Sequence, residues 1–146
     1  MGMRVLISGD REWGKRRLQP IGVHEKRLLI AVVQLIAEID PDALIIEGEA
    51  QGADTLAREN AHANQLDHVG VEAKWRVEGR RAGPVRNKRM LNRWKPDVVI
   101  WFHHDLTHSA GTAHMVKIAN AAGVPTIDGT QRLETVRMML EQLAKK

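Results

Sequence analysis

Five short apolar runs alternate along this chain with segments whose apolar residues recur at helical spacing. The runs end at Gly, Asp or other residues that favour turns, as buried strands do. Strands that alternate with helices need right-handed crossovers, which make the strands parallel and cover the sheet on both faces. The expected strands are residues 4–9, 43–47, 68–75, 97–102 and 123–127. Apolar residues recur at helical spacing in the expected helices, which are residues 28–39, 53–66, 84–94, 111–122 and 131–145.

Length and composition fit one domain of this class over residues 1–146. With 146 residues, 43% apolar and 27% charged, the chain can bury a core of ordinary size. We therefore expect an α/β fold, a Rossmann-like three-layer sandwich with a mostly parallel five-stranded sheet. The absence of Cys excludes disulfides and thiolate metal sites. No apolar run is long enough to span a membrane and no signal peptide is evident, so we expect a cytoplasmic protein without a membrane partner.

The composition of the loops indicates where a ligand would bind. In open parallel sheets, ligands bind beyond the carboxyl ends of the strands, where the strand order reverses. If the first and fourth strands are neighbours at that reversal, the loops after Gly9, Glu47 and Phe102 converge. These three loops have the least ordinary composition of the chain.

The sequence Ser109-Ala110-Gly111-Thr112 marks the start of the helix after the fourth strand. Free backbone N–H groups and the helix dipole make such a start a setting for an anion. The hydroxyls of Ser109 and Thr112 can add donors, and both residue types are also ordinary helix caps. We expect Ser109, Gly111 and Thr112 to hold a phosphate.

The loop from Gly48 to Gly52 leads into a helix that carries Asp54 near its start. Its glycines would let the backbone approach a phosphate or ribose, or they form a tight turn. Asp54 would hold a ribose hydroxyl or cap the helix. The loop is neither a dinucleotide fingerprint nor a P-loop.

Charge is concentrated between Lys74 and Lys95. This segment has nine Lys or Arg residues and one acid, so it carries +8, whereas the whole chain carries +4. This asymmetry of charge suggests a phosphate-bearing partner, either a nucleotide or a nucleic acid. The alternative is that the segment is a solvated basic helix face. Within the segment, we expect Arg86 to neutralise the phosphate, with Asn87 beside it. Replacing Arg86 by Ala should then weaken binding and leave folding intact.

Histidines and a tryptophan complete the candidates. Three imidazoles near Asp105 could bind zinc, but their spacing fits no familiar motif, so we expect no metal and no cofactor. Trp13 lies in a polar loop and is expected to flank a base together with Asp10. The histidines concerned are His103, His104, His108 and, further on, His114.

In chain order, four motifs resemble the SLOG superfamily of Rossmann-like domains. They are Ile7-Ser8-Gly9-Asp10-Arg11, the loop Gly48…Gly52-Ala53-Asp54, Ala82-Gly83-Pro84-Val85-Arg86-Asn87…Met90, and Ser109…Gly111-Thr112. The resemblance covers about residues 4–127 and is greatest to the bacterial and phage YspA-like branch. This superfamily includes the lonely guy phosphoribohydrolases and the DNA-processing protein Smf. The resemblance implies nucleotide-related ligands and a homo-oligomer.

The chain departs from the phosphoribohydrolases at the position of their catalytic carboxylate. The resemblance matches Arg86 to their Arg and Gly111-Thr112 to their Gly-Thr pair. Their leading Pro-Gly-Gly is absent, and His114 and Met115 stand where their acidic pair follows. Because a carboxylate stabilises the oxocarbenium-like state of glycosidic cleavage, this change argues against hydrolysis by the same route. Glu49 and Asp105 are weak candidates for a replacement carboxylate.

Three functions follow from these observations. The leading hypothesis is a domain that binds a nucleotide or nucleotide derivative, to sense or sequester it. An alternative is a hydrolase or transferase at the N-glycosidic bond of nucleoside monophosphates. A further alternative is single-stranded nucleic-acid binding through the segment Lys74–Lys95. In the leading hypothesis, Gly48, Gly52 and Asp54 shape the site around the ribose, and Gly9 is a further ligand-binding residue.

Overall fold

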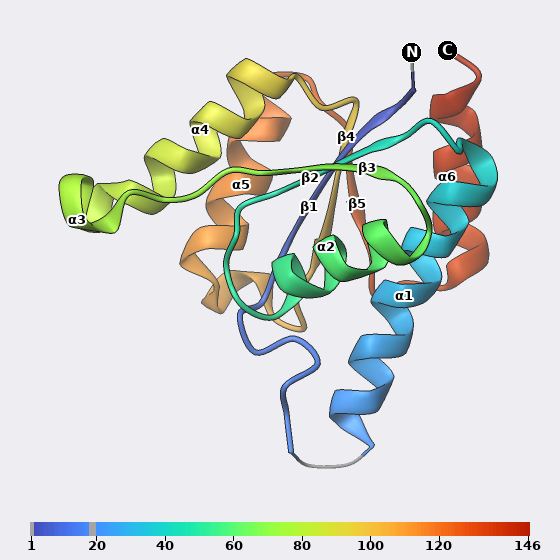
Figure 1. The fold of residues 1–146 in the computed structure, drawn as a ribbon, viewed down its shortest axis with the longest axis horizontal. Coiled ribbons are helices and arrows are strands. Elements are labelled where there is room, and N and C mark those ends of the chain that lie inside the picture. Colours follow the sequence, from blue (N-terminus) through green and yellow to red (C-terminus); the bar gives the residue numbers. More distant parts are fainter. Residues whose placement is uncertain (1, 18–19) are drawn as a thin grey trace.

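A computed structural model describes residues 2–17 and 20–146. It contains a five-stranded parallel sheet in the order β3-β2-β1-β4-β5 (Figure 1). The strands are β1 Arg4–Gly9, β2 Leu44–Glu47, β3 Asp67–Gly70, β4 Val98–Phe102 and β5 Thr126–Asp128. The longer helices are α1 Ile21–Ile39, α2 Ala53–Ala63, α4 Ala82–Trp94, α5 Ala110–Ala121 and α6 Leu133–Ala144. The short ones are α3 Trp75–Glu78, η1 Gly79–Arg81 and η2 Leu106–His108.

The strands divide the core into two layers because successive side chains point to opposite faces of the sheet. In β1, Val5 and Ile7 pack under α1, α2 and α6, whereas Leu6 packs under α4 and α5. Helices therefore cover both faces, as the alternation of strands and helices predicted (Figure 1). The expected Rossmann-like three-layer sandwich is confirmed, and its sheet is parallel throughout the described strands.

The third strand is shorter than predicted. The sequence suggested residues 68–75, but β3 ends at Gly70, which lies opposite Glu47, the last residue of β2. As an edge strand, β3 pairs only with β2, and the Val71 N–H makes a last hydrogen bond to the Glu47 carbonyl oxygen at 2.9 Å. The chain leaves the sheet there, and Trp75 begins α3 instead.

The loop after β1 is closely packed against the start of α2. The carbonyl oxygen of Asp10 accepts hydrogen bonds from the N–H groups of Trp13 at 3.0 Å and Ala53 at 3.1 Å. Gly52 has φ +68°, and a Cβ there would lie 2.4 Å from the carbonyl oxygens of Asp10 and Arg11. The close contact between the loop after β1 and the loop before α2 therefore leaves no room for a side chain at Gly52.

None of the helices in the described part of the chain is long and apolar enough to span a bilayer. The longest of them, α1, has a buried side made up of residues such as Leu29, Val33 and Ile36. That side packs on the sheet with α2 and α6 beside it.

We predict that Gly52→Ala lowers the free energy of unfolding by more than about 2 kcal/mol, because strain and a steric clash add. Gly123→Ala is the matched control, since Gly123 also has positive φ (+75°) but faces open space. It should cost about 1 kcal/mol, the left-handed penalty alone. Urea denaturation of both variants measures this, and equal losses would contradict the close packing at Gly52.

Candidate functional site

A cleft of about 370 Å³ opens beyond the carboxyl ends of β1 and β4. These strands are hydrogen-bonded neighbours, with Gly9 opposite Phe102, and the strand order reverses at β1. The predicted convergence of the three strand-exit loops is therefore confirmed. The cleft is lined by Ile7, Ser8, Gly9, Asp10, Arg11, Ala50, Asp54, Arg86, Asn87, Met90, His103, His108, Ser109, Ala110, Gly111 and Thr112.

The start of α5 forms one wall of this cleft. The Ser109 side-chain oxygen accepts a hydrogen bond from the Thr112 N–H at 3.1 Å, so Ser109 caps the helix. The N–H groups of Ala110 and Gly111 have no acceptor among residues 2–17 and 20–146. A helix start leaves such donors free, and together with the dipole they favour an anion.

Asn87 holds this helix start against α4. Its side-chain amide donates to the carbonyl oxygen of Gly111 at 3.2 Å and contacts Nδ1 of His114 at 3.1 Å. Burial, with the nearby charges of Lys88 and Lys117, lowers the pKa of His114. His114 is therefore neutral near pH 7, and its Nδ1 can accept the Asn87 hydrogen bond.

The Arg86 guanidinium lies between the cleft and the loop after β2. Its Nη1 donates to the carbonyl oxygen of Gly48, and its Nε donates to the Asn87 side-chain oxygen at 3.0 Å. Only 8% of Arg86 is exposed. Burial lowers its pKa, whereas the nearby Asp54 and Glu47 carboxyls oppose that effect. Arg86 therefore helps to assemble the site, and unlike the sequence-based expectation, its replacement by Ala should also destabilise the fold.

Asp54 is a buried carboxyl group in the cleft wall. Its Oδ2 accepts hydrogen bonds from the N–H groups of Gly48 and Ala50, both at 3.2 Å. Burial and the neighbouring charge of Glu47 raise the pKa of Asp54 to about 7. Glu47 is fully buried and pairs with His68 at 2.7 Å. At neutral pH Asp54 is thus partly protonated, which is unusual for a carboxyl group.

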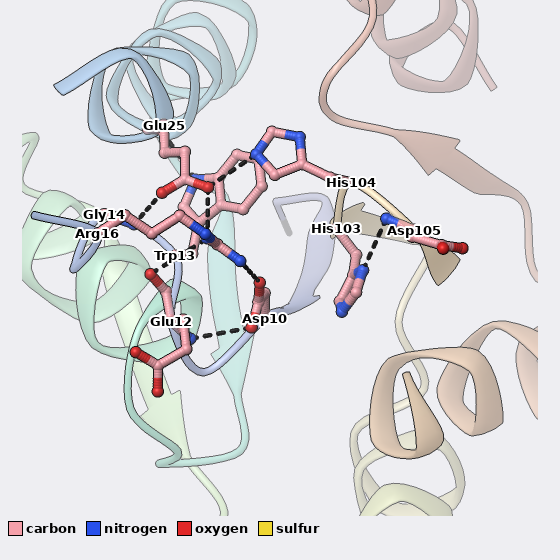
Figure 2. Close-up of polar contacts among 9 residues, drawn as sticks. All are labelled: Asp10, Glu12, Trp13, Gly14, Arg16, Glu25, His103, His104 and Asp105. Atoms are coloured by element: carbon pink, nitrogen blue, oxygen red, sulfur yellow. Dashed lines mark hydrogen bonds and ion pairs between the residues drawn. The ribbon is translucent and has the colours of Figure 1, made fainter. Parts of the chain in front are cut away.

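The environment of Asp10 lowers its pKa, whereas that of Asp54 raises it. Burial would raise its pKa, but hydrogen bonds from Arg16 and the Glu12 N–H, with the charge of Arg16, lower it overall. Arg16 contacts Asp10 at 2.7 Å and the buried Glu25 of α1 at 2.5 Å. His104 contacts the same Glu25 carboxylate at 2.7 Å (Figure 2). This chain of polar contacts joins the loop after β1 to α1 and to the loop after β4.

Trp13 does not lie in the exposed position that the sequence suggested. Its side chain is fully buried, and its indole N–H donates to the Glu25 carbonyl oxygen at 2.8 Å. The centroid of its ring lies 5.8 Å from that of Phe102. It lies 4.7 Å from the centroid of the His104 ring (Figure 2). Trp13 therefore belongs to the core and cannot flank a base.

Eight of the predicted site residues share the cleft. They are Gly9, Asp10, Asp54, Arg86, Asn87, Ser109, Gly111 and Thr112. Gly48 and Glu49 line an adjoining cleft, whereas Gly52 lines neither of the two. Asp105 is outside both; it is exposed and bonded to Thr107 and His108.

Sequence reasoning missed Arg11, which lines both clefts. Its position directly after Asp10 at a strand exit was the available signal. His103 and His108, which were considered as metal ligands but were not among the predicted ligand-binding residues, also line the main cleft. In the described ranges, no group of three or more His, Asp or Glu side chains is placed to hold a metal ion.

The Asp54 environment predicts a pH dependence of stability. Since its pKa is raised to about 7 on folding, the folded state binds more protons than the unfolded state. The free energy of unfolding should therefore fall as the pH rises from about 4 to about 7. Asp54→Asn keeps an oxygen for the Gly48 and Ala50 N–H groups and should show a smaller fall. Urea denaturation of both proteins across this pH range measures the effect. An equal fall in the free energy of unfolding of the two proteins would contradict the raised pKa of Asp54.

Comparison with known proteins shows which family this chain belongs to. Residues 3–77 match the YspA, cpYpsA-related SLOG family. The chain is 30% identical over 130 residues to the Gene 61 protein of Mycobacterium phage D29, covering 86% of this chain and 94% of that protein. No solved structure matches the chain. From the family match, the phage relative and the parallel sheet with its cleft at the strand reversal, we conclude that this chain belongs to the YspA-like SLOG family.

Proposed function

We propose that the protein binds a nucleotide or nucleotide-derived small molecule and places its phosphate at the start of α5. The observation that carries this proposal is the pair of free N–H groups, those of Ala110 and Gly111, in the wall of the main cleft. Backbone donors at a helix start bind phosphate without a sequence signature of their own. Membership in the SLOG family supports a nucleotide-related ligand.

Gly111 supplies a second, steric indication. A Cβ added at this residue would meet no atom within 4 Å, so packing does not require glycine there. Glycine inside a helix costs up to about 1 kcal/mol relative to Ala. A ligand that approaches the backbone closely gives a reason for glycine at this position.

The residues after Gly111-Thr112 favour binding without hydrolysis by the phosphoribohydrolase route. Met115 is fully buried on the inner side of α5, and His114 is held by Asn87. Neither side chain offers a carboxylate at that position. We therefore favour a sensing or sequestering role over turnover.

Gly111→Ala is expected to keep or raise the stability of the protein by up to about 1 kcal/mol, because Ala is the better helix former. It should weaken binding of ribose 5-phosphate and of nucleoside monophosphates by about tenfold, since the methyl group blocks close approach. Titration calorimetry and thermal melting measure the two effects. Gly123→Ala, at the other end of α5, is the control and should leave affinity unchanged. Undiminished affinity in Gly111→Ala would contradict the proposed phosphate position.

One observation favours a second candidate function, cleavage of an N-glycosidic bond. Asp10 and Asp54 line the same cleft, and their environments move their pKa values in opposite directions. Such a pair is typical of acid–base catalysis on glycosides. Asp54 would protonate the departing base nitrogen as the C1′–N bond breaks, with the ionised Asp10 stabilising positive charge on the sugar. Water would then add to C1′ and pass the proton it loses back to the Asp54 carboxylate.

Incubation with a panel of nucleoside monophosphates, followed by chromatography, tests this second candidate. If it is correct, free base and ribose 5-phosphate appear, and Asp54→Asn abolishes their release while binding persists. Recovery of every nucleotide intact would exclude it and leave the binding role.

The segment Lys74–Lys95 supports a third candidate, contact with single-stranded nucleic acid. Seven of its nine basic residues are exposed, and α3 with the start of α4 projects from the body of the protein (Figure 1). Arg86 is buried, and Arg89 approaches Glu78 at 4.0 Å. We rank this candidate below nucleotide binding because exposed cations alone are commonly solvated surface.

A further inference from the structure

A second cleft, of about 560 Å³, adjoins the main one. Arg11, Ala50 and Arg86 line both clefts, so the two lie side by side along these residues. A ligand whose phosphate lies at the start of α5 would reach the second cleft by passing Arg11, the most exposed of the three.

The second cleft contains an aromatic surface that the core does not use. Trp75 is 49% exposed, although large aromatic side chains are usually well buried. The Arg11 guanidinium lies 5.6 Å from the centroid of its ring, within the range of a cation–π interaction. The edge of the ring also approaches α4, since a Cβ built on Gly83 would lie 3.5 Å from its Cη2. These contacts fix the position of the indole before a ligand binds, while part of its surface remains exposed to solvent.

The charges of the second cleft differ from those of the main one. Glu12, Glu49 and Glu72 all line it, alongside Arg11 and Arg86. Three carboxylates repel a second phosphate group but accept hydrogen bonds from amino and hydroxyl groups. Planar heterocycles with amino groups, and sugar hydroxyls, have this chemistry. The second cleft therefore suits the nucleoside end of a nucleotide.

We propose that Trp75 and Arg11 form a base-binding subsite, which stacks a planar nucleobase while the phosphate of the same ligand lies at the start of α5. The inference rests on the proposed function and specifies the orientation of the ligand. Stacking on an aromatic side chain accepts any base, whereas the surrounding carboxylates favour bases that donate hydrogen bonds. Adenine and cytosine, with exocyclic amino groups, are therefore preferred over uracil.

Titration with ribose 5-phosphate and with the adenosine, cytidine and uridine 5′-monophosphates separates this subsite from the phosphate site. The wild type should bind adenosine monophosphate about tenfold tighter than ribose 5-phosphate, the scale of one stacked base. Trp75→Leu should remove this difference and leave the affinity for ribose 5-phosphate unchanged. Trp75→Phe should retain most of it. Val77→Ala, on the same short helix and 82% exposed, is the matched control and should change neither affinity.

Tryptophan fluorescence gives an independent readout that a purely structural role of Trp75 would not produce. Adenosine monophosphate should quench the wild type but not Trp75→Phe, even though that variant still binds the nucleotide. Ribose 5-phosphate should quench neither protein. Equal nucleotide affinity in the wild type and a folded Trp75→Leu would overturn the subsite while leaving the phosphate site intact. Failure of ribose 5-phosphate to bind the wild type would instead overturn the proposed function, and the subsite with it.

Discussion

The parallel pairing of β1 with β4 determines where this protein can bind a ligand. Their pairing places Gly9 opposite Phe102, so the chain leaves both strands at the same edge of the sheet. The connections to neighbouring helices run to opposite faces from that point, which leaves room for a cleft between them. The starts of α2 and α5 then lie around the same space, together with the Arg86 region of α4. The site thus follows from topology before any particular side chain is considered.

Within that space, buried polar groups hold the walls together. Asn87 joins Arg86 to the start of α5, and Arg86 in turn joins α4 to the loop after β2. The buried Arg86 guanidinium lies near the carboxyl groups of Asp54 and Glu47, so little of its charge is available to a ligand. We therefore expect phosphate binding to depend mainly on the backbone N–H groups at the start of α5, with Arg11 as the more exposed cation of the same cleft.

The sheet and half of the residues that line the main cleft could be predicted, because both depend on local patterns. Apolar runs and helical spacing determine the alternation of elements, and glycines and small polar residues mark the strand exits. Ser109 could be recognised as a cap, because residue type and position suffice for that role. The end of β3 could not be predicted, since it depends on how far β2 extends beside it.

Trp13 and Gly52 show the limit of local reasoning in this chain. Polar neighbours made Trp13 look exposed, but the loop folds beneath α1 and its indole meets the Glu25 carbonyl oxygen. Gly52 resembled a ligand-contacting glycine, but it makes room for the backbone of another loop. Both positions are determined by contacts between segments far apart in the sequence. Arg11 was missed for the same reason, since only the packed loops bring it to the junction of the two clefts.

An amide NMR titration of the ¹⁵N-labelled protein with ribose 5-phosphate tests the proposed phosphate position most directly. If the start of α5 binds the phosphate, the amide signals of Ala110 and Gly111 should shift most and saturate together, because a phosphate would accept hydrogen bonds from these two N–H groups. Signals from α6, on the opposite face of the sheet, should stay in place. Shifts confined to the segment Lys74–Lys95, or none at α5 at saturating ligand, would contradict the account.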